Sequence, residues 1–292
     1  MTGSPLPMPL PAMNAAPALL AFDTSTETLA VAACGAQGNC LLNLPGGAAA
    51  SAQLLPQIDI ALAATGLALG DLAAIAFGRG PGAFTGLRTS CAVAQGLALG
   101  LSRPVLPLDS LMVVAEDALA AFVASWSTRP ARPAQPLSAV RVAVAMDARM
   151  DEIYGAVYER RDRGSNSPGD DLGALPWHTL RAPALFTLAA WNAVLDEHAG
   201  DLQGVAGSAL GAFGTRLHSV AAATVWPAEQ NRAAALLRLA QWAWRAGAAV
   251  DAAHALPTYL RDKVALTTRE REVASAVAGA AAGAAAAVGA NR

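Results

Sequence analysis

The residues best suited to do chemistry stand in two short segments near the start of the chain. One is glycine-rich, Gly-Arg-Gly-Pro-Gly-Ala-Phe-Thr-Gly-Leu-Arg at 78–88. Glycine lets a backbone approach a phosphate, or a neighbouring element, more closely than other residues do. The other is Asp23-Thr24-Ser25-Thr26, which offers a carboxylate for a metal ion and short side chains that favour a turn. The first question is whether 78–88 binds a phosphate or only turns the chain.

A phosphate-binding role fits the glycine-rich stretch poorly. A P-loop needs a lysine directly after its last glycine, but Leu87 follows Gly86, and Lys263 is the only lysine. The glycines are not spaced as in a dinucleotide-binding fingerprint, and the proline removes a backbone donor that a phosphate would use. We therefore predict a structural strand-to-helix turn, built by Gly78, Gly80, Pro81, Gly82 and Gly86.

Metal and nucleophile chemistry find little support in the sequence. The histidines at 178, 198, 218 and 254 are isolated, with no HxxxH pair and no nearby cysteine pair. No GxSxG elbow is present. We predict no catalytic residue, no metal and no cofactor. Several charged residues are instead expected to form ion pairs that hold turns: Arg79, Arg88, Asp147, Arg149, Asp151 and Glu152.

Hydrophobic periodicity places these segments in an α/β fold with a mixed sheet, since the expected order is βββαβαβα. The expected strands are 18–22, 29–34, 40–44, 73–77 and 105–108. The expected helices are 51–65, 85–101 and 110–125, with Ser51 and Ser110 as the caps of the first and last.

A second unit of similar build is expected after a proline-rich linker. It has strands at 140–146, 152–159 and 202–206 and helices at 188–198 and 233–246. Both units open with strand, turn, strand, although sequence similarity between them is too weak to prove a repeat. The predicted organisation is a disordered extension 1–17, a lobe 18–108, a second lobe 109–265 with linker 126–138 and mobile loop 160–171, and an Ala/Gly-rich tail 266–292.

Helix 85–101 carries no charge between Arg88 and Arg103. A helix that is apolar on all sides is covered on all sides, and a sheet covers only one. Helix 51–65 is similarly apolar. We predict that the pair forms a docking face, with the second lobe as the alternative cover. Its predicted residues are Leu54, Leu55, Ile58, Leu62, Arg88, Cys91, Ala92, Gln95, Gly96 and Leu99.

Composition limits the partners. The 292 residues are 54% hydrophobic and 14% charged, with a net charge of -2 and a pI near 6.1. A basic nucleic-acid-binding domain is excluded, so any tRNA contact is expected to be indirect or weak. Cys34, Cys40 and Cys91 lack CxxC spacing and are expected to be reduced thiols near the core. No signal peptide and no membrane span are expected, which favours the cytoplasm.

Several motifs, in order over roughly 18–265, resemble the bacterial TsaB family. They are Phe-Asp-Thr-Ser-Thr at 22–26, Leu-Leu-Pro at 54–56, the glycine-rich stretch 78–88, Met-Asp-Ala-Arg-Met-Asp-Glu-Ile-Tyr at 146–154 and Tyr-Leu-Arg-Asp-Lys-Val-Ala at 259–265. The glycine-rich stretch and 146–154 are the specific ones. One departure is Ala49-Ala50, where family members often have a histidine.

The resemblance implies a two-lobed actin-like, or sugar-kinase-like, fold with mixed sheets flanked by helices. It implies a non-catalytic scaffold in the synthesis of threonylcarbamoyladenosine on tRNA, beside a catalytic TsaD subunit and the ATPase TsaE. Family members dock on TsaD, or on themselves as a dimer, through the helices that match 51–65 and 85–101. A charge on the second helix, such as Ala94→Glu, is expected to abolish docking. The alternative is an actin-like ATPase or small-metabolite kinase, with Asp23 holding metal and 78–86 holding phosphate.

Overall fold

A computed structural model describes residues 17–127, 139–161, 177–221 and 223–261. Residues Met1–Thr258 form one compact unit, and of the second unit, Tyr259–Arg292, only 259–261 are described. The predicted extension 1–17, linker 126–138, loop 160–171 and tail 266–292 lie mostly or wholly outside the described residues. The boundary between lobes at 108 and 109 stays a prediction.

The first sheet has the strand order β3-β2-β1-β4-β5. Its strands are β1 Leu19–Asp23, β2 Thr28–Gly35, β3 Gly38–Pro45, β4 Ala74–Gly78 and β5 Val105–Leu108. Its helices are α1 Ala50–Thr65, α2 Phe84–Leu101 and α3 Ser110–Ser127, with short 3-10 turns at Gly47–Ala49 and Leu69–Asp71. Strand β1 pairs antiparallel with β2 and parallel with β4, so the sheet is mixed, as predicted.

The second sheet repeats this arrangement. Read from the other edge, its order is β8-β7-β6-β9-β10, and β6 pairs antiparallel with β7 and parallel with β9. The strands are β6 Ala139–Asp147, β7 Glu152–Arg161, β8 Trp177–Thr187, β9 Gly204–Ala206 and β10 Thr224–Trp226. The helices are α4 Leu188–Glu197, α5 Ala209–Phe213 and α6 Arg232–Arg245, with 3-10 turns at Gly214–Arg216 and Ala252–His254. The related build that the sequence suggested is confirmed.

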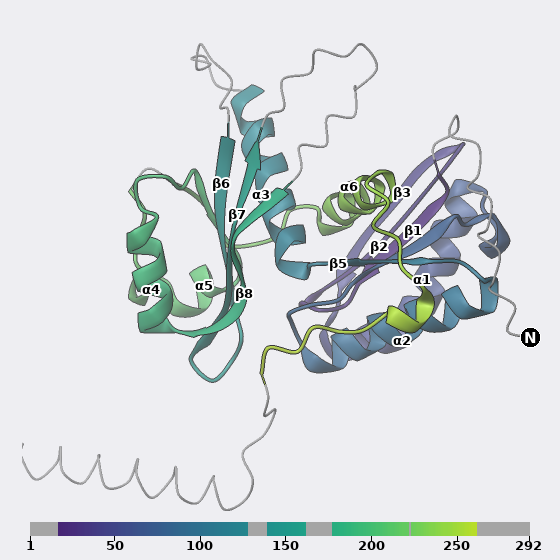
Figure 1. Cartoon of the computed structure of the whole chain (residues 1–292), viewed down its shortest axis with the longest axis horizontal. Coiled ribbons are helices and arrows are strands. Elements are labelled where there is room, and N and C mark those ends of the chain that lie inside the picture. Colours follow the sequence, from purple (N-terminus) through teal and green to yellow (C-terminus); the bar gives the residue numbers. More distant parts are fainter. Residues whose placement is uncertain (1–16, 128–138, 162–176, 222, 262–292) are drawn as a thin grey trace, which may run out of the picture. The chain divides into compact units, whose positions relative to one another are not determined.

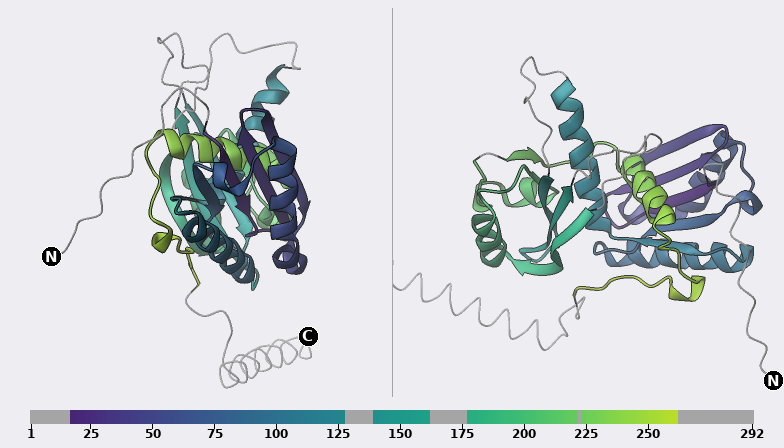
Figure 2. Two further views of the ribbon diagram at one scale, coloured as in Figure 1. Left: turned by 90° about the vertical axis from the view of Figure 1, so that its right-hand side faces the viewer. Right: turned by 45° about the horizontal axis from the view of Figure 1, so that its top comes forward.

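Helices cover both faces of each sheet, which is why the central strands are apolar throughout. On one face of the first sheet, Leu20 and Phe22 pack with α1 and α2 (Figure 1). On its other face, Leu19 and Ala21 belong to a core that continues through α3 and α6 to Val144 and other residues of the second sheet. Two further views show the same elements (Figure 2). The remaining face of the second sheet packs on α4 and α5.

Several local expectations differ from the structure. Helix α1 begins at Ala50 without a side-chain cap, so Ser51 is not its cap. Helix α3 is capped by Asp109, whose carboxylate accepts from the N–H groups of Leu111 and Met112. The Ser110 hydroxyl is used elsewhere, as described below. Strands β8 and β10 and helix α5 were not predicted, because β8 contains a proline and the other two are very short.

The chain returns to the first sheet after α6. Val250 pairs with Val105 at the edge of β5, and the Thr258 N–H donates to the carbonyl of Arg79. Between them, Ala252 and Ala255 enter the core beside α2. We call residues 250–258 the strap. It is an intramolecular cover for α2, made by residues that fall within the range 109–265 predicted for the second lobe.

Candidate functional site

Asp23 is the last residue of β1 and its side chain is completely buried. Its Oδ1 accepts from the Ser25 N–H at 2.7 Å, which forms the turn after the strand. Its Oδ2 accepts from the Ser110 hydroxyl at 2.9 Å and from Arg232 Nη2 at 2.7 Å. The carboxylate that the sequence offered to a metal is therefore held by groups from three other segments.

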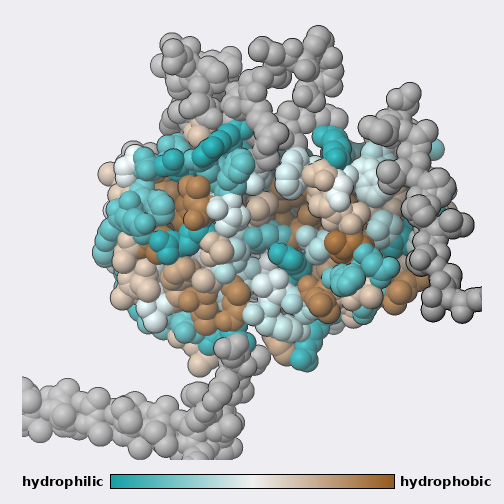
Figure 3. Space-filling view, in the orientation of Figure 1, coloured by the Kyte–Doolittle hydropathy of each residue, from teal (hydrophilic) through white to brown (hydrophobic). Residues whose placement is uncertain are grey.

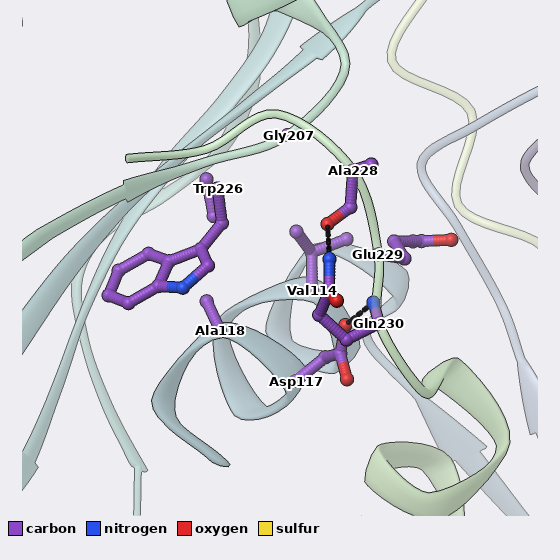
Figure 4. A pocket seen from close by; sticks show the side chains of 9 residues that line it. Val114, Asp117, Ala118, Gly207, Trp226, Ala228, Glu229 and Gln230 are labelled. Atoms are coloured by element: carbon purple, nitrogen blue, oxygen red, sulfur yellow. Dashed lines mark hydrogen bonds between the residues drawn. The ribbon is translucent and has the colours of Figure 1, made fainter. Parts of the chain in front are cut away.

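Arg232 is positioned by the loop that precedes α6. Gln230 and Asn231 donate their backbone N–H groups to the Asp117 carboxylate of α3, at 2.6 and 2.8 Å. Figure 4 shows this loop folded over Asp117 beside Trp226. Asn231 then caps α6 by accepting from the Ala234 N–H. These contacts fix the start of α6, so the first helical side chain reaches Asp23 across the core.

The charges stabilise one another. Burial alone would raise the pKa of Asp23, but the Arg232 charge and the hydrogen bonds from Ser25 and Arg232 outweigh it, so the pKa lies below the ordinary 3.8. Burial alone would lower the pKa of Arg232, but Asp23 and Glu229 raise it further above its ordinary value. Both side chains are 0% exposed, and Glu229 also pairs with Arg232. The site is a buried, fully ionised pair.

The glycine-rich stretch packs directly on this site. A Cβ at Gly78 would lie 1.9 Å from Asp23 Oδ2, and one at Gly86 would lie 1.8 Å from the Thr24 carbonyl oxygen. One at Gly82 would lie 2.4 Å from the Ser25 carbonyl oxygen. Gly80 has a φ of +103° and precedes Pro81 through a cis peptide bond. The space that a phosphate would need beside Asp23 is filled by the chain itself.

Two cavities adjoin the loop before α6. The one in Figure 4, lined by Asp117, Trp226 and Gln230 among others, holds about 10 Å³, room for roughly one water molecule. The other is an open groove of about 400 Å³ lined by Glu27, Asn43, Glu229 and neighbouring residues. Arg232 is also among the residues that line this groove, whereas the buried Asp23 lines neither cavity.

The predicted docking residues divide into two groups. Leu54, Ile58, Leu62 and Cys91 are buried in the core under the first sheet, so they are corrected from interface to core. Ala94 is also buried there, so a charge at Ala94 would disrupt folding and would not test docking. Gln95 is half-buried and donates to the Ala252 carbonyl of the strap.

The other predicted docking residues lie on the outer side of the helices. Leu55 of α1 is 51% exposed, and Leu99 of α2 is 60% exposed. Arg88, Ala92 and Gly96 are exposed along α2, and Arg88 stacks over the Phe84 ring. Ile60, which was not predicted, is 50% exposed on α1. We call these six residues the outer row: Leu55, Ile60, Arg88, Ala92, Gly96 and Leu99.

The turn after β6 is built like the turn after β1. Asp147 ends the strand, and its Oδ1 accepts from the Arg149 N–H at 2.8 Å. Arg149 pairs with Asp147 and with Glu27 of the first turn, and Asp151 pairs with Arg216. The predicted ion pairs are confirmed for these three residues of the second turn.

Sequence reasoning missed Arg232 and Glu229. One signal was present: Arg232 stands on the same helical face as Leu236, Leu239 and Ala243, all core residues. A charged residue in an apolar stripe predicts a buried partner. In the described ranges no three acidic, histidine or cysteine residues gather as metal ligands, and none of the described helices could span a membrane. Cys34, Cys40 and Cys91 are free thiols, as predicted.

Comparisons with known proteins find relatives whose descriptions name the threonylcarbamoylation of tRNA. A family model described as TsaD, tRNA N6-adenosine threonylcarbamoyltransferase, matches residues 46–172. A protein of Haemophilus influenzae described as tRNA threonylcarbamoyladenosine biosynthesis protein TsaB is 39% identical over 136 residues, 47% of this chain and 51% of that protein. Its Escherichia coli counterpart of the same description is 39% identical over 112 residues, 38% of this chain and 42% of that protein. The matched part thus spans about half the length of these relatives.

Solved structures extend the likeness to nearly the whole fold. YeaZ from Pseudomonas aeruginosa has a TM-score of 0.64 and 31% identity, covering 84% of this chain and 100% of that one. A second structure from that organism, described as similar to peptidase YEAZ, has a TM-score of 0.65 and 32% identity over the same shares. Duplicated mixed sheets flanked by helices define a two-lobed actin-like α/β protein. Within that class, the chain belongs to the TsaB family.

Proposed function

We propose that this chain is a non-catalytic subunit in the biosynthesis of threonylcarbamoyladenosine on tRNA. It docks a TsaD-like catalytic subunit, together with a TsaE-like ATPase, and contacts tRNA only through that complex. The names of its relatives place them in this biosynthesis. Its acidic charge balance gives no electrostatic drive toward RNA.

The observation that carries the docking role is the outer row. Leu55, Ile60 and Leu99 expose half or more of their side chains on two helices that cover the same face of the first sheet. Figure 3 shows one face of the molecule as small hydrophobic groups among polar ones. Interfaces that form and separate have this mixed composition, with a few apolar anchors that carry most of the affinity. The same row could pair two copies of the chain in the absence of the partner.

The proposal gives the chain no catalytic step of its own, and the reason is the environment of Asp23. A nucleotide-bound metal at this carboxylate would have to displace Arg232 from a buried pair, and displacement would leave an uncompensated charge in the core. The alternative ATPase or kinase function therefore has no support in this site.

The test is a co-purification of the chain with the TsaD-like subunit of the same organism. Leu99→Glu should lower the affinity at least tenfold and reduce threonylcarbamoylation of tRNA by the reconstituted complex, because an unpaired charge would be buried at the interface. Val225→Glu is the matched control, since Val225 of β10 is 56% exposed and lies on the second sheet. Equal binding by both variants would contradict the proposed surface.

A further inference from the structure

The strap, residues 250–258, follows a fixed path along α2 (Figure 1). Both of its ends are hydrogen-bonded, one to the edge of the first sheet and the other to the glycine-rich stretch. Between them, the Gln95 side chain of α2 donates to the Ala252 carbonyl at 3.3 Å. The Cys91 thiol of α2 donates to the Ala255 carbonyl. Because the Ala252 and Ala255 side chains are also buried, the strap is held by packing as well as by hydrogen bonds.

A tight turn and a proline fix the direction of Leu256. The Leu256 N–H donates to the His254 carbonyl at 2.9 Å, and Ala255 between them has a φ of -69° and a ψ of 81°, as in an inverse γ-turn. The turn places Ala255 in the core, where it is 1% exposed, and leaves Leu256 62% exposed. Pro257 follows and restricts Leu256 to an extended backbone. Leu256 is therefore held outward by a backbone with few other conformations.

Leu256 borders the outer row on α2. Cys91, which bonds the strap directly before Leu256, is three positions after Arg88. Gln95, which bonds the strap further along, is four positions before Leu99. Residues three or four positions apart are neighbours on a helix surface. The exposed surface of α2 therefore continues onto the strap.

We propose that the strap extends the docking surface and that Leu256 is one of its anchors for the TsaD-like subunit. This inference rests on the docking role proposed above. Residues 252–258 contain no Asp, Glu, Lys or Arg, so the strap suits an apolar protein surface and offers no charge to RNA phosphates. A side chain already held in place loses little conformational entropy on binding. Gln95 is a positioning residue, because it holds the strap that presents Leu256.

The test measures binding of the full chain to the TsaD-like subunit of the same organism. Leu256→Glu should lower the affinity at least tenfold, because it buries an unpaired charge at the interface. Its Tm should stay within about 2 °C of the wild type, since the replaced side chain is exposed. Val225→Glu is the matched control, because Val225 is an apolar side chain of similar exposure on the second sheet, and it should bind normally.

Leu99→Glu, measured beside Leu256→Glu, separates this inference from the proposed function. If Leu99→Glu weakens binding and Leu256→Glu does not, the role of the strap is overturned and the docking role stands. If both variants bind like the wild type, the docking surface itself is wrong. Weaker binding by Leu256→Glu with an unchanged Tm supports the anchor whatever Leu99→Glu does. If Leu256→Glu does not fold, Leu256→Ala replaces it and should lower the affinity about fivefold or more.

A double-mutant cycle tests the positioning role of Gln95. Gln95→Leu removes the donor to the Ala252 carbonyl and should lower the affinity about threefold. Gln95→Leu/Leu256→Ala should bind no more weakly than Leu256→Ala alone, because Gln95 acts through Leu256. Additive losses would mean that Gln95 contacts the partner directly, which overturns its positioning role.

A photo-reactive benzophenone side chain at position 256 identifies the occupant. In the reconstituted complex it should cross-link to the TsaD-like subunit, whereas the same group at position 225 should not. Cross-links that join only two copies of this chain, with the TsaD-like subunit present, would overturn the choice of occupant.

Discussion

The turns that follow β1 and β6 share one backbone design but differ in what surrounds them. In each, an aspartate ends the first strand of a sheet and accepts from the N–H two residues later, Asp23 from Ser25 and Asp147 from Arg149. Asp23 is buried and paired with Arg232, whereas Asp147 lies near the surface and pairs with its neighbour Arg149. A repeated fold thus keeps the geometry of a turn while its electrostatic environment changes completely.

The covering helices account for much of the difference. Helix α2 follows β4, and its third residue, Gly86, touches the first turn so closely that no Cβ would fit. Helix α5 follows β9, and its third residue, Gly211, has no atom within 4 Å of where a Cβ would be. The first turn is sealed by its helix and by α6, and the second turn remains open. Because the first turn is closed to water, the charge of Asp23 is balanced by the buried Arg232 and not by solvent.

The largest expected effect comes from removing one charge at each turn. Asp23→Asn leaves Arg232 buried without its main counter-ion and should lower the free energy of unfolding by about 3–5 kcal/mol. Asp147→Asn keeps the oxygen that accepts from the Arg149 N–H and loses only a pair with the exposed Arg149 side chain, so it should cost about 1 kcal/mol at most. Urea unfolding of both variants measures the difference. Equal losses would mean that the two turns are electrostatically alike.

Alanine at the matched third positions of α2 and α5 should change the free energy of unfolding in opposite directions. Gly86→Ala forces a methyl group against the Thr24 carbonyl, 1.8 Å from its Cβ position, and overpacking of this kind costs about 1–3 kcal/mol or more. Gly211→Ala meets no neighbour and should gain up to about 1 kcal/mol, because alanine is the better helix former. Thermal unfolding of both variants is the measurement. A stabilised Gly86→Ala variant would contradict the close packing of α2 on the turn.

Much of the first turn could be predicted from the sequence. Apolar runs that end at Asp23 and at the glycine-rich stretch predicted two of the strands. The missing lysine and Pro81 argued against a bound phosphate. The pairing of Asp23 with Arg232 could not be predicted, because 209 residues separate them and only tertiary packing joins them. The related build of the two units was suggested by their shared strand-turn-strand openings, but the two turns share too little sequence beyond their aspartates to prove a repeat.

The residues that pack on α2 could also be predicted only in part from the sequence. Its uncharged sequence correctly indicated that more than the sheet packs on it, but half of the predicted docking residues contact the chain's own core or strap. Strap residues 250–258 have no helical or strand periodicity that would assign them to that surface. The sequence put Leu55 and Leu99 among the docking residues but could not separate them from the buried ones, and it missed Ile60, because the strap and the sheet decide which side chains stay exposed.

Acid should weaken both turns, and added salt should distinguish them. The pKa of Asp23 is lower folded than unfolded, so its contribution is present above 3.8 and is lost as the pH falls through the folded value. The difference in the free energy of unfolding between the wild type and Asp23→Asn should therefore become smaller as the pH falls below 3.8. The pKa of Asp151 in the second turn is lowered by the hydrogen bond from the exposed Arg216. The gap for Asp151→Asn should narrow likewise, but it should also shrink with added salt, because only exposed charges are well screened. A strong salt dependence at Asp23 would argue that the pair is hydrated.

The smallest effect is expected where the two turns meet. Arg149 of the second turn donates to Glu27 of the first at 3.1 Å, and their side chains are 74% and 81% exposed. An exposed ion pair of this kind contributes little, so Arg149→Ala should change the free energy of unfolding by about 0.5 kcal/mol or less. The matched change Glu27→Ala should have the same small effect, and the double variant should match either single one at high salt. Differential scanning calorimetry at low and high salt measures all three. A loss comparable to that of Asp23→Asn would show that the second turn depends on this surface pair as strongly as the first turn depends on Arg232.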